Sequence, residues 1–260
     1  MKDLRISIIQ FDIAWEEKDK NLKHCYSLVR PLKGLTDMVV LPEMFTTGFS
    51  VDAIPLAETN TGNTIQQVQQ WAQEFGFAVC GSFLTKDDSD NVFNRGFFIT
   101  PEGNTFFYDK RHLFRMGKEN EFITAGNERE IISYKGWNIR MIICYDLRFP
   151  VWIRNRENEY DLLICVANWP ENRADVWVTL LKARALENQC YVCGVNRIGQ
   201  NKSKIPYQGD SLLIDFKGKT MALAEQHEEV IITESINKDL LEGFRKKFPV
   251  WKDADSFELK

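Results

Sequence analysis

The chain has 260 residues, enough for one large domain that buries a sizeable core. Hydrophobic residues make up 44% and charged residues 27%, which is typical of a globular protein, and no low-complexity tract interrupts the sequence. The net charge of −4, with no basic run, weighs against nucleic acid or an anionic membrane as a partner, and no segment approaches the roughly 20 apolar residues of a membrane span.

The first half of the chain alternates strand and helix patterns. Short continuous apolar runs predict buried strands, and apolar residues at helical spacing predict the helices between them. Thr64 is predicted to cap the second helix and Gly76 to end it. In chain order we expect a strand at 4–10, a helix at 16–29, strands at 38–41 and 77–83 around a helix at 65–75, and a hairpin of strands 97–99 and 106–108.

The second half continues with the same two patterns. We expect a loop at 119–126, strands at 131–134, 139–143, 162–167 and 191–195, helices at 150–158 and 176–188, a turn at 207–209, and strands at 211–215, 220–224 and 230–235. The alternation predicts an α/β layered fold with a mixed sheet or a pair of sheets. We expect a single domain over 1–260, with a core at about 4–235 and a charged, aromatic-containing arm at about 236–260 that packs on a partner.

Cysteine usage and the first residues bear on the cellular compartment. The chain begins directly with a strand pattern and lacks the apolar region and small-residue cleavage site of a signal peptide. Six cysteines are sparse for this length, and several lie in apolar strand-like runs. We therefore expect reduced thiols and a cytoplasmic location.

Three chemically reactive residues each follow a predicted strand. Glu43 follows the strand that ends at Leu41, Lys110 follows the strand that ends at Tyr108, and Cys144 follows Ile143. Strand ends lie close together when the strands are neighbours in a sheet, so these side chains are predicted to converge. A carboxylate can take the thiol proton, an ammonium can stabilise a thiolate or an oxyanion, and a thiolate can form a thioester with an acyl carbon.

Each of the three residues also has a purely structural explanation. Cysteine is usually a buried packing residue. Lys110 adjoins Arg111 and His112 and fits a surface cluster, and Glu43 after Pro42 fits an exposed turn. The shared position after a strand is what favours the catalytic interpretation.

Three sequence blocks together resemble the signature blocks of the nitrilase superfamily, the carbon–nitrogen hydrolases. Within it, the chain is most similar to the omega-amidase branch, the bacterial 2-oxoglutaramate amidases, over roughly residues 4–235. The superfamily blocks are Leu41-Pro42-Glu43-Met44-Phe45, Asp109-Lys110-Arg111-His112-Leu113-Phe114 and Ile143-Cys144-Tyr145-Asp146-Leu147-Arg148-Phe149-Pro150. The branch is indicated by Val166-Ala167-Asn168-Trp169-Pro170, Arg184-Ala185-Leu186-Glu187-Asn188-Gln189, Asn196-Arg197 and Gly209-Asp210-Ser211.

The resemblance implies a role for each matched residue. Glu43 would be the general base, Lys110 the oxyanion-stabilising lysine, Cys144 the nucleophile, and the backbone N–H of Tyr145 the second oxyanion donor. A second glutamate is implied after the lysine, and Glu119 fits it better than the nearby Glu121. The implied fold is a four-layer αββα sandwich with two mixed β-sheets between helix layers. The implied assembly is a homodimer that uses no metal and no organic cofactor.

An omega-amidase must also hold the short carboxylate tail of its small-molecule amide. Arg148 and Arg173 are the candidate anchors, because arginine binds a carboxylate through two parallel hydrogen bonds. The alternatives are a structural ion pair for Arg148 and a surface position for Arg173. Phe45, Tyr145 and Trp169 are predicted to form the apolar walls of the pocket.

Other functions remain to be compared with the amidase. A nitrilase or a carbamoyl-amino-acid hydrolase would use the same thioester chemistry. A non-catalytic interaction protein is disfavoured because Glu43, Lys110 and Cys144 are intact. A redox role for Cys190 and Cys193 is disfavoured by their apolar strand-like setting, and the scattered histidines His24, His112 and His227 have no metal-site spacing.

Overall fold

The computed structural model describes residues 3–259, and its strands form two six-stranded sheets and a short hairpin. The first sheet has the order β14-β1-β2-β3-β4-β5: β1 Asp3–Gln10, β2 Met38–Val40, β3 Ala78–Lys86, β4 Val92–Ile99, β5 Thr105–Asp109 and β14 Val230–Asn237. The second sheet has the order β13-β12-β9-β8-β7-β6: β6 Ile132–Tyr134, β7 Trp137–Ile143, β8 Leu162–Ala167, β9 Tyr191–Asn196, β12 Leu212–Ile214 and β13 Thr220–Leu223. The hairpin pairs β10 Ile198–Gln200 with β11 Pro206–Gln208.

Both sheets are mixed and share one plan. Strands β1, β2 and β3 are parallel at the centre of the first sheet, as are β7, β8 and β9 in the second. Antiparallel strands flank each parallel set. The central strands are buried on both faces, which explains why the sequence shows them as continuous apolar runs.

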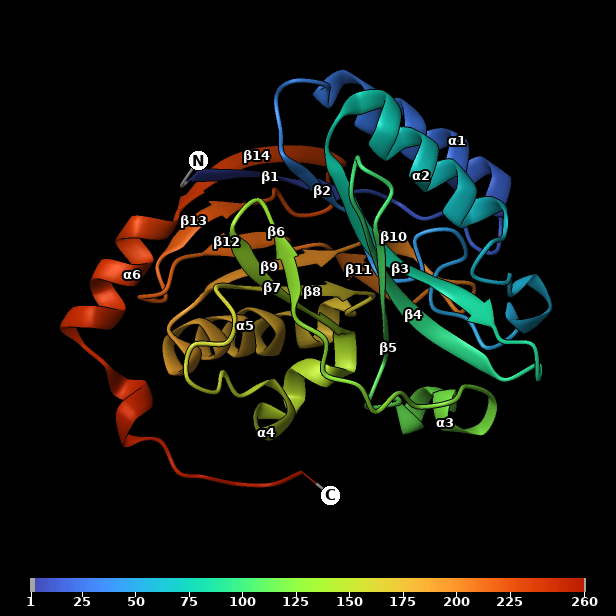
Figure 1. The fold of residues 1–260 in the computed structure, drawn as a ribbon. Coiled ribbons are helices and arrows are strands. Elements are labelled where there is room, and N and C mark those ends of the chain that lie inside the picture. The colour runs from blue at the N-terminus through green and yellow to red at the C-terminus, as the bar shows by residue number, and fades with distance from the viewer. Residues whose placement is uncertain (1–2, 260) are drawn as a thin grey trace.

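Helices cover the outer face of each sheet, as Figure 1 shows. Helices α1 Lys18–Val29 and α2 Asn63–Phe75 lie on the first sheet, and α5 Ala174–Asn188 lies on the second, with α4 Pro150–Ile153 beside it. Alternate residues of β1 divide between two cores: Ile6 and Ile8 face the second sheet, whereas Ile9 faces α1 and α2. The prediction of a four-layer αββα sandwich is confirmed.

The ends of α2 test the helix-end predictions. The N-cap is Gly62, so the prediction that Thr64 caps the helix is wrong. Thr64 lies inside the first turn, and its hydroxyl donates to Glu58 Oε1 at 2.7 Å. At the other end Gly76 adopts φ +76°, a left-handed conformation that glycine reaches without steric cost, so that prediction is confirmed.

Four segments differ from the predicted elements. Residues 119–122 form a one-turn helix, α3 Glu119–Phe122, where a loop was expected. Helix α4 ends at Ile153, because Arg154 leaves the helical conformation with ψ +127°, and the chain then turns through Glu157 and Asn158, which have positive φ, into β8. The turn expected at 207–209 is partly strand β11, and the predicted C-terminal arm contains the helix α6 Lys238–Lys247.

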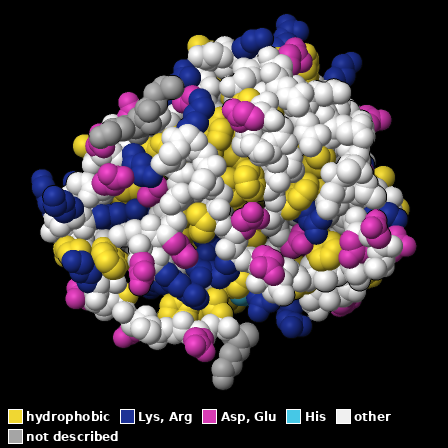
Figure 2. All heavy atoms as spheres, viewed as in Figure 1, with side chains coloured by type: hydrophobic (Ala, Val, Ile, Leu, Met, Phe, Trp, Pro, Cys, Tyr) yellow, Lys and Arg dark blue, Asp and Glu magenta, His cyan; other side chains and the backbone are white. Residues whose placement is uncertain are grey.

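The surface agrees with the low net charge of the chain. Figure 2 shows Lys and Arg side chains interspersed with Asp and Glu over the face that it displays. Within residues 3–259, no helix combines the length and the apolar character needed to cross a membrane.

Candidate active site

The three reactive side chains come from both sheets. Glu43 and Lys110 follow β2 and β5 of the first sheet, whereas Cys144 follows β7 of the second. The expectation that their strands are neighbours in one sheet is therefore wrong. The side chains converge because the two sheets are stacked face to face, so strand ends of one sheet lie over strand ends of the other.

A lysine between two carboxylates forms the buried centre of the site. Lys110 Nζ lies 2.9 Å from Glu43 Oε1 and 3.0 Å from Glu119 Oε1. Glu43 and Glu119 have 0% of their side chains exposed and Lys110 has 1%. Glu121, by contrast, is exposed. Of the two candidates, Glu119 is thus the glutamate that contacts the lysine.

Two asparagines that the sequence analysis gave no role complete the environment of Glu43. Asn94 Nδ2 donates to Glu43 Oε1 at 2.8 Å and to Glu119 Oε1 at 3.3 Å. The backbone N–H of Asn168 donates to Glu43 Oε2 at 2.7 Å, and Asn168 Nδ2 donates to the Glu43 carbonyl at 2.6 Å. The sequence carried one signal for Asn94, a polar residue within a largely apolar strand pattern. In the structure Asn94 lies on the inner face of β4 together with Phe98.

Burial and charge oppose one another in this cluster. Burial alone would lower the pKa of Lys110, but the carboxylates of Glu119 and Glu43 outweigh it and raise that pKa. Burial raises the pKa of Glu119, against the attraction of Lys110. Burial also raises the pKa of the Cys144 thiol well above its usual value; Glu43 adds to this rise and Lys110 opposes it. Burial of Cys144 therefore favours the protonated thiol, and Lys110 favours the thiolate.

The turn that carries Cys144 is held by a buried carboxylate. Cys144 has φ +45° and begins a 3-10 turn directly after β7. Asp146 Oδ2 accepts from the Ile143 N–H at 3.1 Å and from the Tyr108 hydroxyl at 2.8 Å. Asp146 Oδ1 accepts from His112 N and Nδ1, both at 2.8 Å. Asp146 therefore joins the end of β7, which precedes Cys144, to the loop after β5 that carries Lys110.

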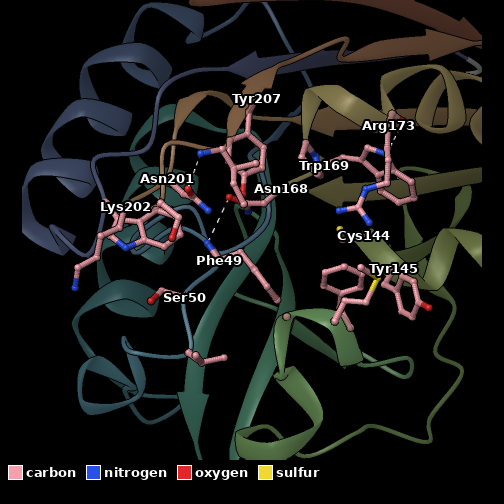
Figure 3. A pocket seen from close by; sticks show the side chains of 18 of the residues that line it. Phe49, Ser50, Cys144, Tyr145, Asn168, Trp169, Arg173, Asn201, Lys202 and Tyr207 are labelled. Atoms are coloured by element: carbon pink, nitrogen blue, oxygen red, sulfur yellow. Dashed lines mark hydrogen bonds between the residues drawn. The ribbon is translucent and has the colours of Figure 1, made fainter.

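A pocket of about 420 Å³ opens over this site. Cys144 and Lys110 form part of its wall, together with four of the predicted substrate-binding residues: Tyr145, Arg148, Trp169 and Arg173. Figure 3 shows Cys144, Tyr145, Trp169 and Arg173 toward one end and Asn201 and Lys202 toward the other. The pocket thus brings the thiol, two guanidinium groups and an aromatic wall around one space.

Phe45 does not belong to this wall, so that prediction is wrong. Its side chain is fully buried on the face of the first sheet that carries α1 and α2, with its ring centroid 5.8 Å from that of Phe97. Met44 adopts φ +45°, which turns the chain just after Glu43 and sends the next side chain into the core. Phe49 and Phe114 supply the aromatic surface at this place instead.

The two predicted anchor arginines have no carboxylate partner among residues 3–259. The Arg148 guanidinium lies over the Trp169 ring at 5.0 Å, and that of Arg173 lies over the Phe114 ring at 5.2 Å. Arg173 Nε is buried and has no hydrogen-bond partner in the described part of the chain. Trp169 Nε1 donates to the Arg173 carbonyl at 2.8 Å and so fixes the backbone there. Both cations remain available to an anionic ligand.

The other cysteines do not form a redox site. Cys190 and Cys193 are free and wholly buried. Burial raises the pKa of Cys190 to about 12 and also raises that of Cys193, the reverse of the lowered pKa that redox thiols need. Among residues 3–259, no three His, Cys, Asp or Glu side chains are grouped so that they could hold a metal ion.

Comparison with known proteins gives a consistent set of relatives. The family model described as carbon-nitrogen hydrolase matches residues 5–246. The chain is 42% identical to the omega-amidase YafV of Escherichia coli (strain K12), with 100% of both chains covered. It is 33% identical to the 2-oxoglutaramate amidase of Bacillus subtilis (strain 168), covering 95% of this chain and 96% of that one. The crystal structure of XC1258 from Xanthomonas campestris, a CN-hydrolase superfamily protein, is 43% identical and superimposes with a TM-score of 0.97 over 100% of both chains.

Proposed function

Because the chain belongs to the carbon–nitrogen hydrolase family, we propose that it hydrolyses the terminal amide of a small oxo-dicarboxylic acid monoamide such as 2-oxoglutaramate. The family and its amidase relatives make the chain a hydrolase of carbon–nitrogen bonds other than peptide bonds. One observation carries the choice of substrate. Cys144 and Lys110 share their pocket with Arg148 and Arg173, two cations that no carboxylate between residues 3 and 259 neutralises.

In the proposed first half-reaction, Cys144 Sγ attacks the amide carbon while Glu43 accepts the thiol proton. The oxygen of the tetrahedral intermediate becomes negative. Lys110 and the backbone N–H of Tyr145 stabilise it, since the first N–H groups of a helical turn have no partner within the turn. When the intermediate collapses, the carbon–nitrogen bond breaks and Glu43 returns the proton to nitrogen. Ammonia leaves, and the acyl group remains on Cys144 as a thioester.

In the second half-reaction, water attacks the thioester and Glu43 accepts one of its protons. The same two donors stabilise the second oxyanion. The carbon–sulfur bond then breaks, the acid leaves, and the thiol is restored. Glu119 keeps Lys110 charged and in place throughout, because its carboxylate lies 3.0 Å from Nζ.

The reaction and its nucleophile can be tested together by measuring ammonia release. The panel contains 2-oxoglutaramate, glutamine, a simple nitrile and a carbamoyl amino acid, each with wild type and Cys144→Ala. We expect release from the oxo-acid amide that the substitution abolishes. Cysteine-dependent release from another panel member alone would refute the substrate, and release that persists in Cys144→Ala would refute the nucleophile.

The carboxylate anchors can be tested by comparing a charged and a neutral substrate. A hydrogen bond to a charged group contributes about 1.5–3 kcal/mol, so Arg148→Ala or Arg173→Ala should lower kcat/KM for the oxo-acid amide by about tenfold to a hundredfold. For a neutral amide the change should be small. The exposed Arg156, which lies outside the pocket, serves as the control substitution. Equal losses on both substrates would contradict the anchor role.

We also propose that the protein acts in the cytoplasm as a homodimer. All six cysteines are free thiols, which fits a reducing compartment. Apolar side chains on the outer helix layer, Val151 of α4 and Leu186 of α5, are more than half exposed and could pair with a second copy. Sedimentation of wild type and of Leu186→Lys tests this, with dimers expected only for wild type. A monomeric wild type would refute it.

A further inference from the structure

Two polar side chains lie behind the base, within the first sheet. Ser82 of β3 and Asn94 of β4 are both fully buried on the inner face of the sheet. Their nearest neighbours on that face are apolar residues or glycine, and no part of either lines the pocket. Since buried polar groups are costly unless they are paired, their hydrogen bonds define what they do.

The bonds of this pair have a direction that the backbone fixes. The Met44 N–H, which can only donate, donates to Ser82 Oγ at 2.8 Å. The Ser82 hydroxyl proton is then free to be donated to Asn94 Oδ1, at 3.0 Å. With its oxygen engaged, Asn94 presents its NH₂ group toward Glu43 and Glu119. The orientation of one amide thus follows from a backbone N–H next to the base.

The oriented NH₂ group of Asn94 donates to two carboxylates, Glu43 and Glu119. Glu43 accepts from Asn94 and Lys110 on Oε1 and from the Asn168 N–H on Oε2. Glu119 accepts from Lys110 and Asn94 on Oε1 and from the Phe114 N–H on Oε2. A hydrogen bond donated to a carboxylate favours its charged form. Asn94 therefore donates to both carboxylates at once, in a site where burial raises the pKa of Glu119.

We propose that Ser82 and Asn94 are positioning residues that hold the Glu43 carboxylate oriented to take the proton of Cys144. Neither touches the substrate; both act through Glu43. The inference rests on the proposed function for the identity of the base. It assigns the placement of the base to a pair of side chains in β3 and β4.

The test uses three substitutions and one matched control. Asn94→Leu removes the donor at similar volume, Asn94→Asp places a third carboxylate at the same spot, and Ser82→Ala frees the amide to rotate. Thr85→Val is the control, because Thr85 is a fully buried hydroxyl of the same strand that donates to the Glu58 carbonyl at 2.6 Å, away from the site.

Two pH profiles are measured for each protein: kcat/KM for the amide, and the rate at which iodoacetamide alkylates Cys144, followed by mass spectrometry. In both, activity falls at low pH when the base is protonated. We expect Asn94→Leu to shift this acid limb upward by about one pH unit, the equivalent of one hydrogen bond to a charged group, with KM changed less than about twofold. Asn94→Asp should shift it further, Ser82→Ala in the same direction by less, and Thr85→Val not at all.

An unchanged acid limb in Asn94→Leu and Ser82→Ala would overturn the proposal, as would an equal shift in Thr85→Val. Should Asn94→Leu fail to fold, Ser82→Ala decides alone. Alkylation needs no particular substrate, so it separates the two ideas. A shifted alkylation profile in a protein that cleaves none of the amides would retain the positioning role and refute the proposed function.

Discussion

Asp146→Asn is the substitution that most directly tests how the Cys144 turn is held. The change keeps the size and shape of the side chain and replaces one carboxylate oxygen by an NH₂ group. Both oxygens of Asp146 accept a backbone N–H, from Ile143 on Oδ2 and from His112 on Oδ1. Backbone donors cannot rotate away. Whichever way the new amide turns, its NH₂ group therefore faces a backbone N–H.

The magnitude follows from the bonds lost. One buried backbone donor left without a partner costs about 1–3 kcal/mol, and replacing a charged acceptor by a neutral one weakens the remaining bonds by about 1 kcal/mol. We expect the free energy of unfolding to fall by about 2–4 kcal/mol. Because Asp146 also joins the Cys144 turn to the Lys110 loop, kcat should fall more than KM rises.

Urea unfolding and steady-state kinetics of the same preparations check both effects. Asp210→Asn is the matched control, since the Asp210 carboxylate is also buried but accepts from the side-chain amides of Gln208 and Gln226. Those amides can flip to accommodate an asparagine, so its cost should stay below about 1 kcal/mol. Equal destabilisation by the two substitutions would refute the argument from fixed backbone donors.

Two further predictions concern stability away from the site. Burial raises the pKa of Asp37, but hydrogen bonds from Arg5 and Lys135 outweigh it and hold that pKa well below its usual range. The stability that this carboxylate contributes is present above the unfolded-state pKa of about 4 and is lost as the pH falls below it. Asp37→Asn should therefore flatten the acid side of a plot of melting temperature against pH. An unchanged acid side would contradict this. Arg245 Nη1 lies 2.9 Å from the buried Asp161 carboxylate, so Arg245→Met leaves that carboxylate with one cation fewer. The free energy of unfolding should fall by about 3 kcal/mol. A fall below about 1 kcal/mol would show that α6 is held by its apolar face alone.

The reactive residues could be predicted because each follows a strand whose apolar run is plain in the sequence. Glu43, Lys110 and Cys144 were identified in this way, and the resemblance to a family added Glu119. What the pattern could not give was the pairing of strands in space. The three strand ends meet across two stacked sheets, and no local periodicity distinguishes that arrangement from neighbours in one sheet.

Residues that act through others were harder to predict. Asn94 and Ser82 lie within largely apolar strands, and their partners Glu43 and Met44 are 51 and 38 positions away in the sequence. Phe45 was misplaced for a related reason. The chain turns at Met44, which has a positive φ, and the residue types of that loop give no signal of the turn.

The two sides of the pocket are formed by different kinds of structural element. The side with Cys144 and Lys110 is positioned by strands β2, β4, β5 and β7, whose hydrogen bonds and buried faces leave their residues little freedom. The rest of the pocket wall is formed largely by connecting segments, among them residues 114–117 and 201–205, where no strand register fixes the side chains. Substitutions in those loops should alter which amide is accepted while leaving the thioester chemistry intact. This is why the reaction type followed from the sequence, whereas the residues that select the amide could not be read from strand patterns.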